Sequence, residues 1–246
     1  MDDLLILTAL AVTPCIAIAL FIYWRDKFEK EPFNLLVLAF FGGIGSVVPA
    51  FFISRGLEDI LMGTDRPHVI EMAVDAFICT ALAEEASKYF FLRVIAYSNK
   101  NFNEPFDGIT YSVMVAMGFA MVENLLYVLG DANGGLETAL VRMFTAIPAH
   151  AVFAIIMGYY VGLAKYKNNK KTYLAIGLIA ATVVHGFYDF FIFIQNVPYI
   201  YIGALVSLVY GVVLSFKAIR LHKQNSPFAP GANGEENKLG ESETGF

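Results

Sequence analysis

Long apolar runs, separated by short polar stretches, extend along almost the whole chain. A helix that crosses the hydrocarbon core of a bilayer needs about 20 mostly apolar residues. Seven runs meet this requirement and predict membrane-spanning helices over residues 4–24, 33–54, 70–94, 107–129, 138–164, 172–195 and 199–219. A different division near Pro49 or Pro198 would give six or eight spans, and a short interfacial helix is expected within residues 53–69. The pattern predicts an all-α, polytopic transmembrane helix bundle.

Composition supports a membrane protein and gives no sign of a nucleic-acid-binding one. The chain is 57% hydrophobic and 16% charged, whereas soluble domains are about 45–50% apolar and about 25% charged. Its net charge is −5, and no basic patch accompanies the apolar spans, so the sequence does not indicate binding to nucleic acid. Cys15 and Cys79 both lie inside apolar runs, which is typical of small buried residues.

Lysine and arginine are distributed unequally between the polar segments, which predicts the orientation in the membrane. Only Arg55 and Arg66 lie in the segments that would be outside if the N-terminus is outside. The segments that would face the cytoplasm carry Arg25, Lys27, Lys30, Arg93, Lys100, Lys165, Lys167, Lys170, Lys171, Lys217, Arg220, Lys223 and Lys238. We therefore expect the N-terminus outside and the C-terminus in the cytoplasm. Residues 1–222 form the predicted membrane domain, and the polar residues 223–246 are expected to be a disordered cytoplasmic tail.

Four consecutive spans contain polar side chains that are costly in a membrane. A charged group at the bilayer centre costs roughly 2.5–3.5 kcal/mol on insertion scales, so such groups normally face a bundle interior or a wet cavity. The residues concerned are Glu84, Glu85 and Lys88 in the third span, Glu123 and Asn124 in the fourth, Arg142 and His150 in the fifth, and His185 and Asp189 in the sixth. Their concentration in neighbouring spans predicts one shared interior site.

Depth and spacing support a shared site. At about 1.5 Å per residue, Glu84, Glu123, His150 and His185 each lie roughly 18–24 Å from one end of their helix, close to mid-membrane. Lys88 follows Glu84 by four residues and Glu85 by three, so it can pair with both carboxylates on one helix face. His185 and Asp189 have the same i,i+4 spacing, at which the acid can orient the imidazole.

Taken singly, these residues also have structural interpretations. A Glu–Lys pair can hold helices together, a membrane histidine is often an interhelical contact, and Arg142 can serve as an interfacial anchor or a counter-ion. The set at one depth favours catalysis, and acids and histidines in a secluded pocket suit hydrolysis with a glutamate as general base. No GxSxG or HExxH motif is present. The same residue types could also bind Zn²⁺, and the sequence leaves a metal-free and a zinc mechanism open.

Four segments carry a resemblance to a known family. The stretches AEEASKYF (83–90), GFAMVENLLYV (118–128), HAVFAIIMG (150–158) and HGFYD (185–189) resemble the EExxK, FxxxEN, His-to-Gly and HxxxD motifs of the PrsW family of intramembrane proteases. That family belongs with the prenyl-protein CAAX endopeptidases and the bacteriocin-immunity-type membrane proteases. The resemblance covers roughly residues 5–220. Some relatives have an acid directly after the phenylalanine, where this chain has Ala120.

The resemblance implies a multi-pass protease of the cytoplasmic (inner) membrane that cleaves a single-span membrane protein, such as an anti-sigma factor cut first on its outer side. It implies that Glu84 and Glu85 are the catalytic acids, with Glu84 preferred as the base that activates water. His185 and Asp189 correspond to the oxyanion-binding pair. If zinc is present, the expected ligands are His150, Glu123 and His185. Lys88 and Asn124 are expected to support the site.

Three other functions remain compatible with the sequence. A proton- or ion-coupled transporter would also place charged residues at mid-membrane, although no internal repeat is visible here. A non-catalytic protein could keep the same fold, but all four motifs are intact. A CAAX-type prenyl-peptide protease is the third. Glu123 and the final Asp189 argue against it, because the CAAX enzymes that this chain resembles have His and Asn at the corresponding positions.

Overall fold

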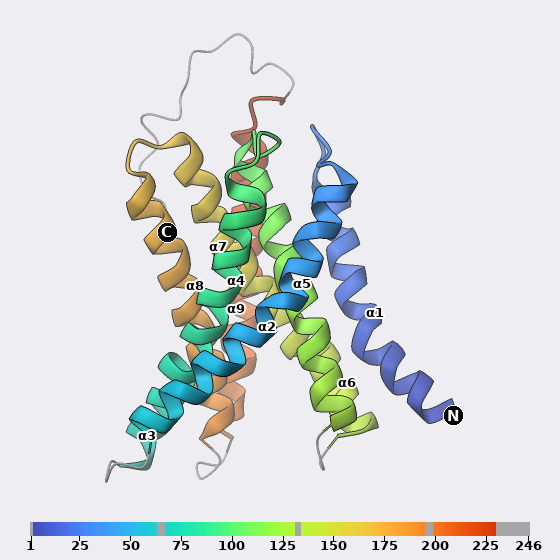
Figure 1. Ribbon diagram of the computed structural model, residues 1–246, viewed down its shortest axis with the longest axis vertical. Coiled ribbons are helices and arrows are strands. Elements are labelled where there is room, and N and C mark those ends of the chain that lie inside the picture. The colour runs from blue at the N-terminus through green and yellow to red at the C-terminus, as the bar shows by residue number, and fades with distance from the viewer. Residues whose placement is uncertain (1, 63–66, 131–133, 195–198, 230–246) are drawn as a thin grey trace.

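The computed structural model of the protein describes residues 2–62, 67–130, 134–194 and 199–229. All regular structure in these ranges is helical (Figure 1), which confirms the predicted all-α bundle. The elements are α1 (Asp2–Arg25), α2 (Phe33–Leu61), α3 (His68–Val74), η1 (Asp75–Leu82), α4 (Ala83–Leu92), η2 (Arg93–Tyr97), α5 (Pro105–Gly130), α6 (Leu136–Phe144), α7 (Ala146–Tyr166), α8 (Lys170–Phe193) and α9 (Tyr201–Gln224). The segments labelled η1 and η2 are π-helical turns within a longer helix.

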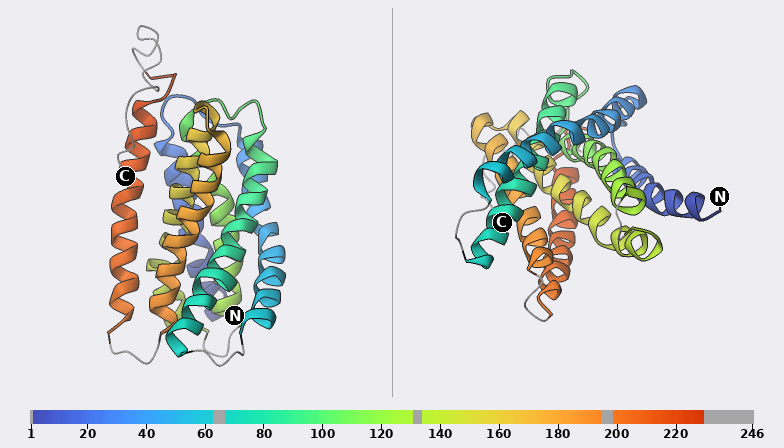
Figure 2. Two further views of the ribbon diagram at one scale, coloured as in Figure 1. Left: turned by 90° about the vertical axis from the view of Figure 1, so that its left-hand side faces the viewer. Right: turned by 60° about the horizontal axis from the view of Figure 1, so that its bottom comes forward.

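Six helical stretches of the described residues are long and apolar enough to cross a membrane: α1, α2, α5, α6 with α7, α8 and α9. This number is the lower end of the predicted range. The remaining expected span is a continuous helical run from α3 to η2, which lies against α8 and extends along the bundle (Figure 2). Glu84, Glu85 and Lys88 lower its apolar character, and they are the residues that the sequence singled out as candidate site residues.

The boundaries of two predicted elements were wrong. Helix α2 continues through Pro49 to Leu61, so residues 53–61 extend the second span and do not form a separate interfacial helix. The fifth span is divided at Thr145, whose φ of −121° and ψ of −73° are not helical. Pro148 explains this break, because a proline ring clashes with the carbonyl group four residues earlier, here that of Phe144.

Helices α5 and α7 form the centre of the bundle and cross at glycines. Helix α5 packs against α1, α2 and α7, and α7 packs against α8 and α9. A Cβ atom added at Gly158 of α7 would lie 2.3 Å from the carbonyl oxygen of Gly108 in α5. A Cβ atom at Gly118 of α5 would lie 1.9 Å from the carbonyl oxygen of Phe40 in α2. Membrane helices commonly use such small residues, because close backbone approach gives more dispersion contact where no hydrophobic effect operates.

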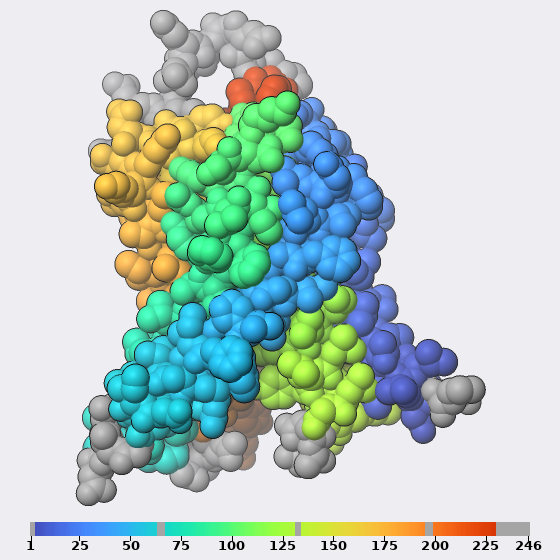
Figure 3. All heavy atoms as spheres, viewed as in Figure 1, coloured from blue at the N-terminus to red at the C-terminus, as the bar shows by residue number. Residues whose placement is uncertain are grey.

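The outer helices present large apolar side chains to the surroundings. Leu5 in α1, Phe52 in α2 and Tyr210 in α9 are each more than half exposed, as are many of their neighbours. Figure 3 shows α2 as a continuous band across one face, with α6 emerging beside its lower part. A soluble protein rarely exposes so much contiguous apolar surface, so these faces fit contact with lipid. The chain is a multi-pass membrane protein.

The basic connecting segments lie together at one end of the bundle. Helix α1 begins at one end, and α9 ends at the other, near the connections formed by residues 26–32, 98–104 and 167–169 (Figure 2). These connections include Lys27, Lys100 and Lys167. The end that carries them is called the basic end below. Residues 223 and 224 of the predicted tail belong to α9, residues 225–229 follow that helix at this end, and residues 230–246 lie outside the described ranges.

We expect Gly118→Ala to lower the free energy of unfolding by about 1–3 kcal/mol, because overpacking forces two helix backbones apart. The matched control is Gly56→Ala in α2, where an added Cβ would meet no atom within 4 Å. This control should be neutral or slightly stabilising, since alanine is the better helix former. Thermal unfolding of both variants in detergent measures the difference, and equal midpoints would contradict the close approach of α2 and α5.

Candidate active site

The four polar segments of the sequence meet in the interior of the bundle, and α6 adds a fifth contributor. Helix α4 contacts α5 and α8, while α7 contacts α5, α6 and α8, so side chains on the facing surfaces of these helices can meet. The network consists of Glu84, Glu85 and Lys88 of α4, Glu123 and Asn124 of α5, Arg142 of α6, His150 of α7, and His185 and Asp189 of α8. All of the predicted site residues are therefore brought together.

Lys88 is the hub of the network. Its Nζ atom lies 2.8 Å from Oε1 of Glu85 and 3.1 Å from Oε2 of Glu84. It also lies 3.2 Å from Nδ1 of His150 and 4.0 Å from the centre of the Phe119 ring. A charge as deeply buried as this one must be paired and hydrogen-bonded to be tolerated. The ammonium group also reduces the repulsion between the two adjacent carboxylates.

The two glutamates of α4 differ in their surroundings. Glu85 is 2% exposed, and its Oε1 atom contacts both Lys88 and Nδ1 of His185, the latter at 3.0 Å. Glu84 is 13% exposed, and its contacts are Lys88 and, at 4.0 Å, Nε2 of His185. Glu85 is thus fixed by two short contacts from two helices. Glu84 has the freer and more accessible carboxylate, the property that a base acting on water requires.

His150 is held between a lysine and an acid, which fixes its tautomer. The Nδ1 atom faces the Lys88 ammonium, which can only donate, so Nδ1 accepts that hydrogen bond. The Nε2 atom lies 2.8 Å from Oε2 of Glu123 and donates to it. The lone pair of Nδ1 is consequently directed toward the acids of α4. A carboxylate that orients an imidazole in this way is a common partner of metal-binding histidines.

His185 lies between two acids and against an aromatic ring. Its Nδ1 atom is 3.0 Å from Glu85, and its Nε2 atom is 3.1 Å from Oδ2 of Asp189. The ring stacks on Phe153 with 4.4 Å between centroids, and its centroid is 5.5 Å from that of His150. The i,i+4 contact between His185 and Asp189 confirms the geometry predicted from their spacing. The packing holds the imidazole in one orientation.

Arg142 belongs to the network, and of the two roles predicted for it, interfacial anchor or counter-ion, its contacts support the second. Its Nη2 atom lies 2.8 Å from Glu123, and its Nε atom donates to Oδ1 of Asn124 at 2.7 Å. Asn124 in turn donates to the carbonyl oxygen of Ala11 at 3.3 Å. Arg142 is therefore the counter-ion of Glu123. The signal in the sequence is the same as for the other site residues, because Arg142 is a charged residue inside a predicted span.

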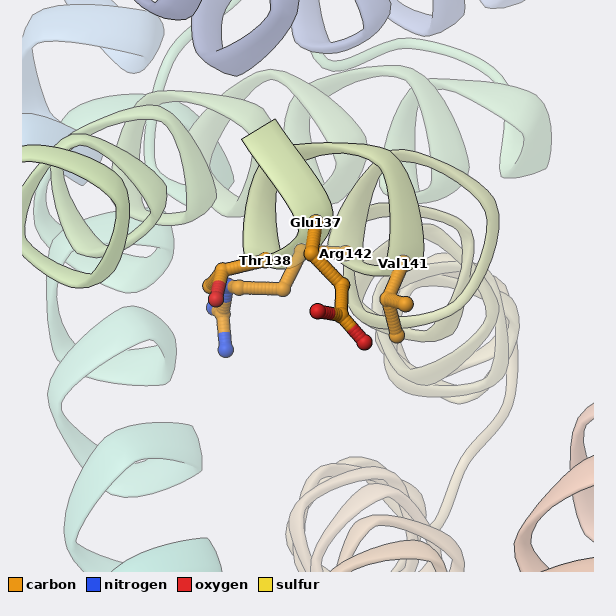
Figure 4. A pocket seen from close by; sticks show the side chains of 4 residues that line it. All are labelled: Glu137, Thr138, Val141 and Arg142. Atoms are coloured by element: carbon orange, nitrogen blue, oxygen red, sulfur yellow. The ribbon is translucent and has the colours of Figure 1, made fainter. Parts of the chain in front are cut away.

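A pocket of about 370 Å³ adjoins this network beside α6. Glu137, Thr138, Val141 and Arg142 line it, and their side chains project from α6 into one hollow (Figure 4). Arg142 forms both part of the pocket wall and the contact with Glu123. Helix α6, which carries these four residues, lies near the end of the bundle opposite to the basic end (Figure 1).

One potential metal-binding group lies in the network. Single donor atoms of Glu84, His150 and His185 all lie within 4.8 Å of one another. One carboxylate and two imidazoles are a common ligand set of catalytic zinc, with the fourth position left for water. The residues present thus fit such an ion. The sequence grouped Glu123 with the two histidines, whereas the structure gives that place to Glu84 and directs Glu123 to Arg142 and to the far nitrogen of His150.

The fold and the network together define a polytopic membrane protein with a buried acid–histidine site of hydrolase type. The chain belongs to the PrsW family: the profile of PrsW family intramembrane metalloproteases matches residues 31–216. It is 34% identical to Protease PrsW of Geobacillus kaustophilus over 224 residues, which cover 91% of this chain and 93% of that protein. No solved structure matches. The predicted family is confirmed, and the protein is an intramembrane endopeptidase.

Two further relatives support the same family assignment. Protease PrsW of Bacillus subtilis is 34% identical over 181 residues, which cover 73% of this chain and 79% of that protein. Protease PrsW of Shouchella clausii is 39% identical over 189 residues, with coverages of 76% and 82%.

We expect Arg142→Gln to lower the rate of peptide-bond cleavage about 10- to 100-fold, the usual effect of removing a group that orients a catalytic residue. Arg142→Lys should not restore the rate, because a single ammonium cannot contact both Glu123 and Asn124 with the same geometry. Arg55→Gln is the control, since Arg55 pairs with Glu58 on the exposed surface. Cleavage assays on equal amounts of folded protein test this, and an unchanged rate in Arg142→Gln would exclude the orienting role.

Proposed function

We propose that this endopeptidase cleaves single-span membrane proteins with a water molecule that Glu84 deprotonates. The observation that carries the proposal is the difference between the two acids of α4. Glu85 is held by Lys88 and His185, whereas Glu84 keeps the more accessible carboxylate next to both histidines. A carboxylate in a secluded, apolar site is a usable general base near neutral pH.

The neighbouring residues have supporting roles in this mechanism. Glu84 accepts a proton from water and returns it to the amine that leaves when the peptide bond breaks. The negative charge that develops on the carbonyl oxygen is stabilised by the Lys88 ammonium and by His185, whose Nδ1–H is held by Glu85. Asp189 orients His185 from the other side. Glu123, supported by Arg142, does the same for His150.

A divalent metal ion is compatible with the same residues, and the family is described as metalloproteases. Glu84, His150 and His185 would hold it. A bound Zn²⁺ ion would polarise the substrate carbonyl and lower the pKa of a bound water to about 7. Glu85 contacts His185 and Glu123 contacts His150, so these two acids would orient the imidazoles that hold the ion. Lys88 would have to move aside, because its ammonium lies between Glu84 and His150.

The position of the α6 pocket supports cleavage on the outer side of the cytoplasmic membrane. The basic end of the bundle is expected in the cytoplasm, because positively charged segments are retained there. The pocket beside α6 is then at the outer end, and Arg142, which lines it, contacts Glu123. A substrate segment that reaches the site from outside fits the outer-side cleavage of a membrane-anchored protein that the family resemblance implies.

We expect Glu84→Gln to abolish cleavage while the folded protein still accumulates, because the amide cannot accept a proton but keeps the size of the side chain. The measurement compares the new termini of membrane proteins in cells that express wild type or the variant at equal levels. Termini near the outer edge of single-span proteins should appear only with wild type. Glu58→Gln, which changes an acid that pairs with Arg55 and does not belong to the network, should behave like wild type. Identical termini with Glu84→Gln would refute the assigned base.

Metal content separates the two roles of Glu84. We expect purified wild type to contain about one Zn²⁺ per chain, and His150→Ala and His185→Ala to lose it. If Glu84 is a ligand, Glu84→Gln should lose the metal too, whereas a base that does not bind metal would leave the zinc content unchanged and cleavage absent. Elemental analysis of the purified variants measures this. Full activity in metal-free protein would refute the zinc mechanism and leave the glutamate mechanism.

A further inference from the structure

A second group of acidic residues is buried at the basic end of the bundle, away from the α6 pocket. It consists of Asp26, Glu29 and Glu31 from the connection between α1 and α2, Glu104 from the segment before α5, and Asp107 from the first turn of α5. We call this set the carboxylate cluster. All but Glu29 are buried, and Asp26 and Asp107 have no exposed surface. The candidate active site does not include any of these residues.

The carboxylate cluster has cations nearby, because Lys30 acts to lower the pKa of Asp26 and Lys223 that of Glu104. Within the described ranges, however, no ion pair to its members is found. Lys30 lies beside the cluster, but its ammonium donates to the backbone carbonyl oxygens of Tyr23 and Asp26. Lys165 donates to the carbonyl oxygen of Tyr97. Buried carboxylates normally need a paired charge or a coordinated metal.

Several carboxylate oxygens in the cluster are buried and have no hydrogen-bond partner among the described residues. They are both oxygens of Asp26, Oε2 of Glu29, Oε1 of Glu31 and Oδ1 of Asp107. Buried polar atoms without partners are rare in folded proteins, and each one needs a physical explanation, such as a bound ion.

The other oxygen of each ligand candidate is held in place. Tyr111 donates its hydroxyl proton to Oε2 of Glu31. Oδ2 of Asp107 accepts from the backbone amides of Asn103 and Glu104 at 2.6 and 2.8 Å. The side-chain amide of Asn103 donates to Oε1 of Glu29 at 3.3 Å. Each carboxylate is therefore oriented through one oxygen and leaves the other free, as is typical of carboxylates that bind metal.

We propose that the carboxylate cluster binds a hard divalent cation, Ca²⁺ or Mg²⁺, through Glu29, Glu31 and Asp107. One oxygen from each of these residues lies within 4.8 Å of the others. An all-oxygen, acidic ligand set selects these ions over zinc. Two oxygens on opposite sides of Ca²⁺ are about 4.6–5.2 Å apart, and on opposite sides of Mg²⁺ about 4.0–4.2 Å. Mg²⁺ demands a near-ideal octahedron of ligands, whereas Ca²⁺ accepts more flexible oxygen geometries, so Ca²⁺ is the preferred ion.

A cation at this position joins two parts of the chain, and a third part lies beside it. Glu29 and Glu31 belong to the α1–α2 connection, and Asp107 begins the central helix α5. Ser226, which follows α9, donates its hydroxyl proton to Glu104 beside them. The ion thus stabilises the basic end of the bundle, where the first two helices and the last meet the centre.

Protons are the competing occupants of the carboxylate cluster. Burial, together with the neighbouring Glu104 and Glu31, raises the pKa of Asp26 to about 8. Burial also raises the pKa of Glu104. The protonated form of Asp26 therefore favours folding, and this contribution to stability is lost as the pH rises from about 4 to about 8. A cation bound beside Asp26 would favour its ionised form and reduce this loss.

The test is thermal unfolding of the purified full-length protein in detergent at pH 8, after removal of metals with a chelator. Ca²⁺ at about 100 times its Kd should raise the Tm of wild type by roughly 5–10 °C, and Mg²⁺ should act more weakly. Glu31→Gln and Asp107→Asn should lose this response. Glu29→Gln, the change at the least buried ligand, provides a variant that is less disturbing to the fold. Calorimetric titration of wild type with Ca²⁺ measures binding directly.

Two controls locate the effect. Asp59→Asn changes an exposed acid near the other end of α2 and should keep the full response to Ca²⁺. Glu84→Gln should also keep it, which distinguishes the carboxylate cluster from the active site and makes this test independent of the proposed catalytic mechanism. A wild-type Tm that depends on pH but not on Ca²⁺ or Mg²⁺ would show that protons occupy the cluster and would overturn the proposal. An equal Ca²⁺ response in wild type, Glu31→Gln and Asp107→Asn would overturn it as well.

Discussion

The contact of the Lys88 ammonium with Glu84 and Glu85 is the interaction on which the rest of the site depends. Two adjacent carboxylates cannot both stay ionised in an apolar helix bundle without a cation close to them. Lys88 supplies that cation from the same helix and extends the network to His150. The pairing keeps Glu85 fixed against His185 and leaves Glu84 comparatively free, which gives two chemically identical side chains different roles.

The glycine crossings of α5 are what allow such short polar contacts between helices. Gly118 lets the backbone of α5 approach that of α2, and Gly108 with Gly158 does the same for α5 and α7. Because these backbones lie so close, short side chains such as Glu123 and His150 can meet at 2.8 Å across the helix interface. Packing and chemistry are therefore linked: a change that separates the helices would lengthen the hydrogen bonds of the site before it unfolded the protein.

The two buried acidic groups of the protein show opposite solutions to the same electrostatic problem. In the active site each acid has a lysine, arginine or histidine partner at a distance of 2.8–3.1 Å. In the carboxylate cluster most of the acids are buried, no described residue forms an ion pair with them, and Oε1 of Glu31 and Oδ1 of Asp107 have no hydrogen-bond partner in the described part of the chain. The acids of the active site are balanced by cationic side chains of the protein itself. The acids of the cluster depend on protons or a metal ion bound from solution.

The sequence by itself determined the fold class, the approximate spans and the identity of the site. Apolar runs of about 20 residues have one low-energy form in a bilayer, the helix, because every backbone polar group must be satisfied internally. Charges such as Glu84 and His185 in those runs can only be tolerated where helices face one another, so composition and depth alone indicated which residues would meet. Spacing of three or four residues also predicted the contacts within one helix, such as Lys88 with both glutamates.

The contacts between side chains of different helices were decided by the tertiary structure, because they depend on which surfaces of the helices face one another. Arg142 pairs with Glu123 and Asn124 because α6 breaks from α7 at Thr145 and turns toward α5, a local bend that span prediction merged into one helix. The grouping of Glu84, and not Glu123, with the two histidines depends on the rotation of α4 and α5 about their axes. The carboxylate cluster joins segments about 80 residues apart. Sequence spacing carries no information about such rotations and long-range meetings, because packing over the whole bundle sets them.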